Sequence, residues 1–391
     1  MALHDHVAAR AGARAPRVCL AGFARDTDAR ETQTRTCPRP VGPDQGRSPG
    51  GAGHALGHGV APAFGPGMEP ARRLGTEDRA TAGGGPGERC YGGPVKVLVV
   101  GGSGFIGREV VRQLVAAGHR PRVLARGTRG AMPGVEAVTG SVLEPEGLDA
   151  ACAGCEAVVY LAGIIAEVGD QTYERIHVDG TVHMLAAARA AGIRRWVHMS
   201  ALGSRPGAPS RYHRTKWAGE ERVRASALDA TILRPSLVFG PGDGFLNLFA
   251  RIARWSPVMP LIGGGTMEFQ PIAVEEVARC FVAAVGGLGR GTAFAVCGRE
   301  RVTLRGIVGA MLEATGRRRL MVTVPWWAAR LQAMAFEWAF PALLRKAPPL
   351  NRDQLLMLAE GNTGDPEPMI REFGFEPRPF RDGVRAMFVR C

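Results

Sequence analysis

Three evenly spaced glycines between an apolar strand and a helix constrain the fold of this chain more than any other feature. Gly101, Gly104 and Gly107 directly follow the apolar run Val95–Val100, which has the length and β-branched character of a buried strand. Apolar residues at helical spacing come next, and a second strand, Pro121–Ala125, follows them. This order predicts a β-turn-α-β unit.

The glycine spacing also predicts what this unit binds. In such a turn the first glycine allows a tight reversal, the second lets a pyrophosphate approach the backbone, and the third lets the helix pack on the strand. The start of the helix offers unpaired N–H groups and the positive end of the helix dipole. We therefore predict a dinucleotide site here; the alternative is a glycine turn in an ordinary α/β domain.

The end of the second strand bears on which dinucleotide binds. A carboxylate at that position hydrogen-bonds the free 2′-hydroxyl of NAD. Here the strand is followed by Arg126, Arg129 comes soon after, and the next acidic residue is Glu136. Because a guanidinium can pair with a 2′-phosphate through two hydrogen bonds, the sequence favours NADP(H) over NAD(H). The alternative is that Arg126 is only a solvated surface arginine.

The chain beyond this unit continues to alternate strands and helices, which predicts a doubly wound, Rossmann-type parallel sheet with helices on both faces. We assign residues 95–240 to this NAD(P)-binding domain and residues 241–391 to a smaller α/β lobe, interleaved with it, that supplies the substrate or partner side. Further elements are expected as strands at Val135–Thr139, Ala157–Leu161, Trp196–Met199 and Thr231–Leu233, and as a long helix at Tyr173–Ala191.

Residues that follow the strands are expected to share one edge of this sheet. Ligands of doubly wound sheets bind at the carboxyl ends of the strands. Five residues fall at this edge, namely Gly101, Arg126, Gly163, Ser200 and Pro235.

Tyr212 and Lys216 form a Tyr-x-x-x-Lys pair on one face of the helix that follows the strand ending at Ser200. A neighbouring ammonium favours the phenolate of a tyrosine, whose free pKa is ~10. Lys216, one of three lysines in the chain, can also hydrogen-bond the nicotinamide ribose. Ser200, with Ser204 as the weaker alternative, can hold a substrate carbonyl or hydroxyl. These parts suit proton transfer beside hydride transfer, and the residues leave open whether they turn over a substrate.

The net charge of +13 belongs mainly to the part of the chain expected to fold. Residues 1–94 hold 12 arginines and 9 acidic residues, whereas the remainder holds 37 basic and 27 acidic residues. The basic residues are scattered, and aromatic side chains do not alternate with them as a nucleic-acid stacking surface requires. We therefore expect a surface suited to an anionic membrane or an acidic partner, and no nucleic acid.

Residues 1–94 are rich in Gly, Ala, Pro and Arg and lack periodicity, which predicts a disordered extension. The alternative is a start at Met68 or later, with the upstream residues an artefact of the gene model. The eight cysteines are dispersed and predict no metal site. Cys152 and Cys155 form a lone C-x-x-C, which we interpret as two buried packing thiols rather than a redox or metal pair.

The segment Val324–Leu344 is apolar almost all round and contains Trp326, Trp327 and Trp338. Its charges and Pro341 argue against a membrane span, which requires about 20 mostly apolar residues. Two readings remain open. The segment is either a buried core helix or a surface that docks on a membrane interface or a hydrophobic partner.

These motifs together resemble an extended or atypical short-chain dehydrogenase/reductase of the NAD-dependent epimerase/dehydratase type. The resemblance rests on GGSGFIG at 101–107, YLAG at 160–163, the Tyr-x-x-x-Lys pair and LRPSLVFGPGD at 233–243. Three longer runs, at 194–221, 233–254 and 260–278, are similar to the NAD(P)H-binding accessory subunit of mitochondrial respiratory complex I and its bacterial relatives.

The resemblance implies a tightly held cofactor and, for the narrower group, a structural role that outweighs turnover. It implies that Tyr212 and Lys216 face the nicotinamide, that Arg126 takes the 2′-phosphate, and that the remaining cofactor-binding residues are Gly101, Ser103, Gly104, Phe105, Ile106, Gly107, Leu161, Ala162, Gly163 and Pro235. The chain departs from the family pattern at three places. His177 replaces a usual Asn, Ser141 replaces an Asp that commonly meets the adenine, and Glu275-Glu276 replaces an acidic pair containing Asp. The first two departures weaken the case for turnover.

Two functions follow as hypotheses. The first is a cofactor-holding accessory or assembly component of respiratory complex I, cytoplasmic and peripheral on the inner membrane, or in the matrix of a mitochondrion. The second is a soluble NADP-dependent oxidoreductase, epimerase or dehydratase that uses Tyr212, Lys216 and Ser200. The three longer runs and the tryptophan-rich segment favour the first hypothesis, and the intact Tyr-Lys pair favours the second.

Overall fold

A computed structural model of the 391-residue chain describes residues 93–127, 132–340, 343 and 347–389. The extension predicted for residues 1–94 lies almost wholly outside the described residues, as does Arg129.

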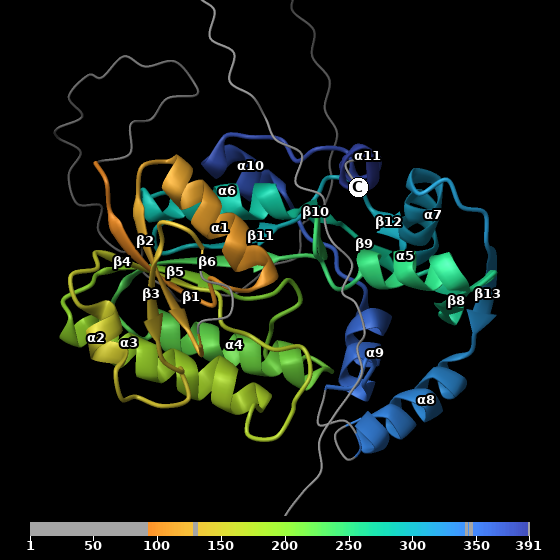
Figure 1. Ribbon diagram of the computed structural model, residues 1–391, viewed down its shortest axis with the longest axis horizontal. Helices are drawn as coiled ribbons and strands as arrows, with labels where there is room; N and C mark the ends of the chain where they lie inside the picture. Colours follow the sequence, from red (N-terminus) through yellow and green to blue (C-terminus); the bar gives the residue numbers. More distant parts are fainter. Residues whose placement is uncertain (1–92, 128–131, 341–342, 344–346, 390–391) are drawn as a thin grey trace, which may run out of the picture. The chain divides into compact units, whose positions relative to one another are not determined.

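A seven-stranded parallel sheet forms the centre of the described part (Figure 1). Its spatial order is β3-β2-β1-β4-β5-β6-β11, and the order reverses between β1 and β4. The doubly wound sheet predicted from the sequence is therefore confirmed. The strands are β1 (Lys96–Val100), β2 (Arg120–Ala125), β3 (Glu136–Thr139), β4 (Ala157–Tyr160), β5 (Arg195–Met199), β6 (Asp229–Pro235) and β11 (Ala293–Val296).

Helices cover both faces of this sheet because alternate strand residues are apolar on both sides. In β1, Val97 and Val99 pack beneath one helical layer, and Leu98 and Val100 pack against the other. The first layer contains α1 (Phe105–Ala116) and α6 (Val274–Val285), and the second contains α2 (Leu148–Cys152), α3 (Gly180–Ala190) and α4 (Arg211–Arg224) (Figure 1).

Short strand pairs and helices build the C-terminal lobe. The strand pairs are β7 (Val238–Phe239) with β10 (Ile272–Ala273), β9 (Glu268–Phe269) with β12 (Val302–Thr303), and β8 (Val258–Ile262) with β13 (Leu320–Val324). The helices are α5 (Leu246–Trp255), α7 (Leu304–Ala314), α8 (Trp326–Ala339), α9 (Arg352–Glu360), α10 (Glu367–Phe373) and α11 (Phe380–Val389). Helix α6 and strand β11 come from beyond residue 240 and pack on or join the main sheet. The domain boundary placed at residue 240 stays a prediction. None of the helices in the described part is long and apolar enough to cross a bilayer.

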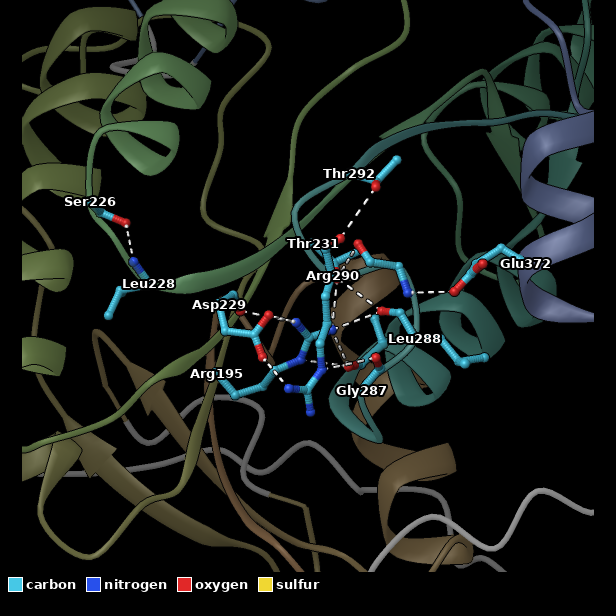
Figure 2. A network of polar contacts seen from close by, with 12 residues as sticks. Arg195, Ser226, Leu228, Asp229, Thr231, Gly287, Leu288, Arg290, Thr292 and Glu372 are labelled. Atoms are coloured by element: carbon cyan, nitrogen blue, oxygen red, sulfur yellow. Dashed lines mark hydrogen bonds and ion pairs between the residues drawn. The ribbon is translucent and has the colours of Figure 1, made fainter. Parts of the chain in front are cut away.

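A buried arginine fixes the amino-terminal edge of the sheet (Figure 2). Arg195, the first residue of β5, pairs with Asp229 at 3.2 Å and donates to the hydroxyl of Thr231 at 2.7 Å. It also donates to the carbonyls of Ala284 at 2.8 Å and Leu288 at 2.9 Å, at and beyond the end of α6. This network lies at the edge opposite the carboxyl ends of the strands, so its role is structural.

Candidate functional site

The glycine turn after β1 has the geometry that its spacing predicted. Gly101 adopts a φ of +83°, which favours glycine, and its carbonyl accepts the Gly104 N–H at 3.1 Å. A Cβ added at Gly107 would lie 2.2 Å from the carbonyl oxygen of Gly101. Only glycine at position 107 therefore lets α1 pack this closely on the turn.

The first turn of α1 is suited to an anion. Its cap, Gly104, offers no side chain, and no acidic residue lies in the first turn. The N–H groups of Phe105, Ile106 and Gly107 are therefore left for a ligand, with the positive end of the helix dipole behind them. Ser103 stands immediately before this turn. The glycine cradle and the open helix start fit the pyrophosphate of a dinucleotide.

The end of β4 lies against the same turn. A Cβ added at Gly101 would lie 3.2 Å from the carbonyl carbon of Leu161 and 3.3 Å from the nitrogen of Ala162. These residues and Gly163 thus adjoin the point between β1 and β4 where the strand order reverses, which is the usual ligand crevice of such sheets.

Two further predicted residues lie at the carboxyl ends of strands. Arg126 follows β2, is exposed, and makes no hydrogen bond or ion pair with the described residues. Its guanidinium is therefore available for a phosphate. Pro235 is the last residue of β6 and is buried, so it contributes packing at this edge.

Lys216 lies buried beside the end of β4 and the end of β5. Its Nζ donates to the carbonyl of Met199 at 2.5 Å, and a Cβ added at Gly163 would lie 3.6 Å from the same Nζ. Burial lowers the pKa of Lys216 to about 8, although the carboxylate of Glu220 opposes the shift. The ammonium remains the main form at neutral pH.

Tyr212 is held between two other rings of the site. Its ring lies edge-on to Tyr173, with ring centroids 6.0 Å apart, and edge-on to His177, with centroids 5.4 Å apart. Burial raises the pKa of Tyr212 to about 12, so the phenol is protonated at neutral pH. Asp353 accepts the backbone N–H of Tyr212 at 2.9 Å and that of Arg211 at 2.7 Å, which fixes the start of α4.

Ser200 follows β5 and is buried. Its hydroxyl lies 3.2 Å from the hydroxyl of Ser204, and its N–H donates to the carbonyl of Leu233 at 2.7 Å. The two serines proposed as alternatives therefore share one hydrogen bond, and together they can orient a polar substrate group.

His177 connects three elements around Tyr212. The N–H of Ile164 donates to its Nε2 at 3.1 Å, so Nδ1 carries the proton and donates to the hydroxyl of Thr215 at 2.8 Å. Thr215 donates to the carbonyl of Tyr212 at 3.0 Å. Burial holds the pKa of His177 well below its usual range, and the Lys216 ammonium lowers it further. The histidine is therefore a neutral link that positions α4 and the loop after β4.

The long helix predicted over Tyr173–Ala191 runs from Tyr173 to Ala190 and contains a π-helical turn at this histidine. The turn spans Arg175–Asp179, and the regular helix α3 begins at Gly180. A Cβ at Gly219 of α4 would lie 2.5 Å from the carbonyl oxygen of His177, so α4 packs directly on the widened turn. Close packing of α4 accompanies the departure from regular helix.

A pH titration tests the role of His177. Below pH ~6.5 the unfolded chain binds a proton at this histidine and the folded chain does not, so folding free energy is lost as the pH falls. We expect the loss between pH 7 and pH 5 to be smaller in His177→Asn than in the wild type, because the folded-state pKa of His177 is lowered. Urea unfolding at both pH values measures this difference, and equal losses in the two proteins would contradict the assignment.

A cavity of about 890 Å³ lies between the loop after β4, the start of α4, and helices α8 and α9. Apolar groups, including Trp326, Leu355 and the ring of Tyr173, form much of its wall. Arg211 is paired with Glu167 at 2.9 Å on the same wall, whereas Arg330 makes no ion pair with any described residue. Neither Tyr212 nor Lys216 lines the cavity, but Tyr173 on its wall contacts the ring of Tyr212.

Comparison with known proteins gives matches that cover about three quarters of this chain. A family profile described as NAD(P)H-binding matches residues 101–243. Sterol demethylase protein B of Methylococcus capsulatus is 30% identical over 322 residues, which cover 73% of this chain and 94% of that protein. The chain belongs to the short-chain dehydrogenase/reductase family, in its NAD(P)-binding, epimerase/dehydratase-like branch.

Two other relatives of this short-chain dehydrogenase/reductase differ in their roles. Ceramide reductase of Caulobacter vibrioides is 39% identical over 194 residues, 48% of this chain, and the match spans only 60% of that protein. The NADH dehydrogenase [ubiquinone] 1 alpha subcomplex subunit 9 of Arabidopsis thaliana is 29% identical over 295 residues, 71% of each chain. The fold matches UDP-glucose 4-epimerase of Thermotoga maritima with a TM-score of 0.61 and 18% identity, over 75% of this chain and 97% of that one.

The residues at the three departures from the dehydrogenase/reductase pattern all make hydrogen bonds in the structure. His177 makes the two side-chain hydrogen bonds described above. Ser141 accepts the Leu143 N–H at 3.2 Å and so stabilises a local turn. Glu276 accepts the N–H groups of Ala273 at 3.3 Å and Arg378 at 2.7 Å, a capping role.

Sequence reasoning missed three residues of the site, namely Tyr173, Thr215 and Asp353. Tyr173 had a weak signal, since the chain contains only four tyrosines. Asp353 had none, because it lies 141 residues beyond Tyr212. Cys152 and Cys155 are buried free thiols, and burial raises the pKa of Cys152 to about 12, in keeping with packing residues.

Proposed function

We propose that this protein is an NADP(H)-dependent reductase of a carbonyl group on an apolar, lipid-like substrate. The observation that carries the proposal is the largely apolar cavity of about 890 Å³ whose wall includes Tyr173, the ring that contacts Tyr212. A cavity of this size accommodates a drug-sized or larger apolar ligand. The relative named ceramide reductase supports a long-chain substrate.

The proposed chemistry assigns one role to each site residue. The reduced nicotinamide supplies a hydride to the carbonyl carbon. The carbonyl oxygen then becomes an alkoxide, a much stronger base than a phenolate, and the protonated phenol of Tyr212 donates its proton to it. Lys216, cationic at neutral pH, stabilises the phenolate that remains until solvent returns the proton. Ser200 donates a hydrogen bond to the same substrate oxygen and orients it.

Arg126 supports the preference for NADP(H). It stands after β2, where the adenosine ribose is read, and it has no carboxylate partner among the described residues. A guanidinium that is free of other partners can take a 2′-phosphate through two hydrogen bonds.

A pair of arginine substitutions at the two ends of β2 tests this preference. In Arg126→Ala we expect the Kd for NADPH to rise about 10-fold or more, with the Kd for NADH unchanged, because only NADPH carries the 2′-phosphate. The matched control is Arg120→Ala, an exposed arginine at the opposite end of the same strand. Fluorescence titration of both cofactors measures the effect, and equal losses for NADPH and NADH in Arg126→Ala would refute the role.

A second candidate function is an accessory or assembly component of respiratory complex I that holds the same cofactor. The specific observation in its favour is the 29% identity with the complex I subunit 9 proteins of Arabidopsis thaliana and Mus musculus, which extends over 71% and 62% of this chain. The sequence alone put this role first. The cavity, whose wall includes the ring next to Tyr212, and the intact Tyr-Lys pair move the reductase ahead, because a purely structural cofactor holder requires neither.

The experiment for the proposed function is a substrate screen with the full-length protein and NADPH in detergent. The leading compound is the ceramide skeleton with its secondary alcohol oxidised to a ketone, and carbonyl compounds without alkyl chains are the matched set. We expect turnover only with long-chain carbonyls. Absence of turnover, together with co-migration of the protein with an NADH-oxidising complex on a native gel, would favour the accessory role. In both roles we propose that the protein is peripheral on the cytoplasmic or matrix side of an inner membrane.

A further inference from the structure

Helix α8 carries a row of exposed apolar side chains. Trp327, Leu331, Met334 and Trp338 follow one another at steps of four, three and four residues, so they lie along one side of the helix. Their exposed fractions are 67%, 58%, 50% and 76%. We call these four residues the apolar stripe.

The opposite side of α8 holds the helix in place. Ala329 and Ala333 are fully buried and pack against Leu355 of α9. Glu337 pairs with Arg352 at 2.7 Å, which joins the same two helices. The orientation of α8 is therefore fixed by the lobe, and the apolar stripe faces outward because of that packing.

Other exposed apolar groups gather near the stripe. Of the 11 large apolar side chains that are exposed in the described residues, eight belong to the stripe or to Trp255, Leu320, Val322 and Leu343. Trp255 ends α5, and Leu320 and Val322 lie on β13, which pairs with β8 and leads into α8. Figure 1 shows β8, β13 and α8 at one end of the C-terminal lobe. This concentration indicates a docking surface rather than scattered surface residues.

A cluster of arginines borders this surface. No acidic residue lies between Asp243 and Glu268 or between Glu313 and Glu337, yet these segments contain six arginines. None of the six forms an ion pair with the described residues. The two segments are in contact, since Arg319 donates to the carbonyl of Ala253 at 2.8 Å. Within the first segment, the guanidinium of Arg254 lies over the ring of Trp255, 5.4 Å from the ring centroid. We define the basic cluster as the five arginines of α5 and of the segment just before β13, namely Arg251, Arg254, Arg317, Arg318 and Arg319. The sixth, Arg330, lines the cavity instead.

We propose that the apolar stripe and the basic cluster dock the protein on the interface of an anionic lipid bilayer. The stripe would enter the boundary between headgroups and acyl chains, where tryptophan is favoured, and the arginines would pair with lipid phosphates. Stable attachment without a spanning helix requires two such signals, and this surface supplies both.

Charge argues against a second copy of the chain as the occupant. A two-fold contact through the stripe would bring two basic clusters toward each other, and like charges at an interface are unfavourable. An anionic bilayer instead complements the arginines of the basic cluster. This surface is where the peripheral attachment proposed above would occur, and the inference rests on that proposed attachment. It also gives α8 two ligand-facing sides, since Trp326 and Arg330 line the cavity that would receive a lipid-like substrate.

Vesicle flotation of the full-length protein tests the surface. We expect binding to vesicles that contain phosphatidylglycerol, weaker binding to pure phosphatidylcholine, and further weakening at high salt. In Trp327→Ala/Trp338→Ala the partition coefficient should fall at least ~10-fold on both lipids, because apolar area is lost. In Arg254→Gln/Arg318→Gln it should fall about 30-fold on phosphatidylglycerol only, since each arginine near an anionic surface contributes about 1 kcal/mol. The control, Val115→Ala/Val182→Ala, removes exposed apolar side chains of α1 and α3 and should bind as the wild type does.

The outcomes separate this inference from the proposed function, because turnover of a long-chain ketone in detergent is measured on the same proteins. Loss of vesicle binding with turnover retained in the tryptophan variant supports the surface. A wild type that turns over the ketone but never floats overturns the surface and leaves the reductase standing. Equal losses in the stripe and control variants overturn it too. The inference is also overturned if the wild type does not bind vesicles and instead forms dimers that the tryptophan substitutions dissociate.

Discussion

Tyr212→Phe is expected to lower the rate of ketone reduction by about 10²–10⁴-fold, the range typical for loss of a positioned general acid. The ring contacts with Tyr173 and His177 remain in this variant, and only the hydroxyl is removed. NADPH binding and the melting temperature should therefore stay close to those of the wild type. Initial rates with NADPH and the long-chain ketone measure the first effect, and titration and thermal unfolding measure the other two.

The matched control is Tyr173→Phe. It makes the same chemical change in the neighbouring ring and removes a hydrogen bond to the carbonyl of Ile165. We expect a rate loss below about 10-fold there, because loss of a net hydrogen bond of about 1 kcal/mol corresponds to about 5-fold. Similar rate losses in both variants, or a Tyr212→Phe protein with the wild-type rate, would remove Tyr212 from the chemistry and favour the accessory role.

Arg195→Met is expected to destabilise the protein by about 1–3 kcal/mol, because it removes the donor of several buried hydrogen bonds while Asp229 keeps its pair with Arg290. The variant removes the guanidinium donor from the carbonyls of Ala284 and Leu288 and from the hydroxyl of Thr231 (Figure 2). The two carbonyls keep weaker partners, the N–H of Gly287 and the hydroxyl of Thr231, respectively. The network is far from the carboxyl ends of the strands, so NADPH affinity of the folded protein should not change. Urea unfolding measures the loss.

Arg290→Met serves as the control because Arg290 pairs with the same carboxylate, Asp229, at 3.0 Å. Its side chain is 65% exposed, whereas that of Arg195 is 9% exposed. We expect a loss below about 1 kcal/mol, as for other exposed pairs. Equal destabilisation of the two variants would mean that burial of the Arg195 network does not account for its contribution to the free energy of unfolding.

Local sequence patterns were sufficient to predict the central sheet and part of the candidate site. The glycine turn was predictable because its three positions lie within seven residues and each glycine has a steric reason. Tyr212 and Lys216 were predictable as a pair because helical spacing places them on one face. Their neighbours came from elsewhere in the chain. Asp353, which fixes the start of α4, belongs to a helix more than a hundred residues away, and no local spacing points to it.

Two other features depended on tertiary packing. The π-helical turn at Arg175–Asp179 had no signal in the local sequence, and it is accompanied by the close packing of Gly219 on the carbonyl of His177. The segment Val324–Leu344 is apolar almost all round, and such a pattern cannot decide between a core helix and a surface helix. The structure assigns Ala329 and Ala333 to the buried side of α8 and leaves Trp327 and Trp338 exposed.

The central claim is that this protein transfers hydride from NADPH to a lipid-like carbonyl with Tyr212 as the proton donor. The most direct measurement uses NADPH deuterated at the transferring position of the nicotinamide and the long-chain ketone, with mass spectrometry of the product. We predict one deuterium on the newly formed carbinol carbon with the wild type, and almost none with Tyr212→Phe in the same time. A wild-type protein that binds NADPH tightly yet transfers no deuterium to any long-chain ketone of the screen would contradict the account.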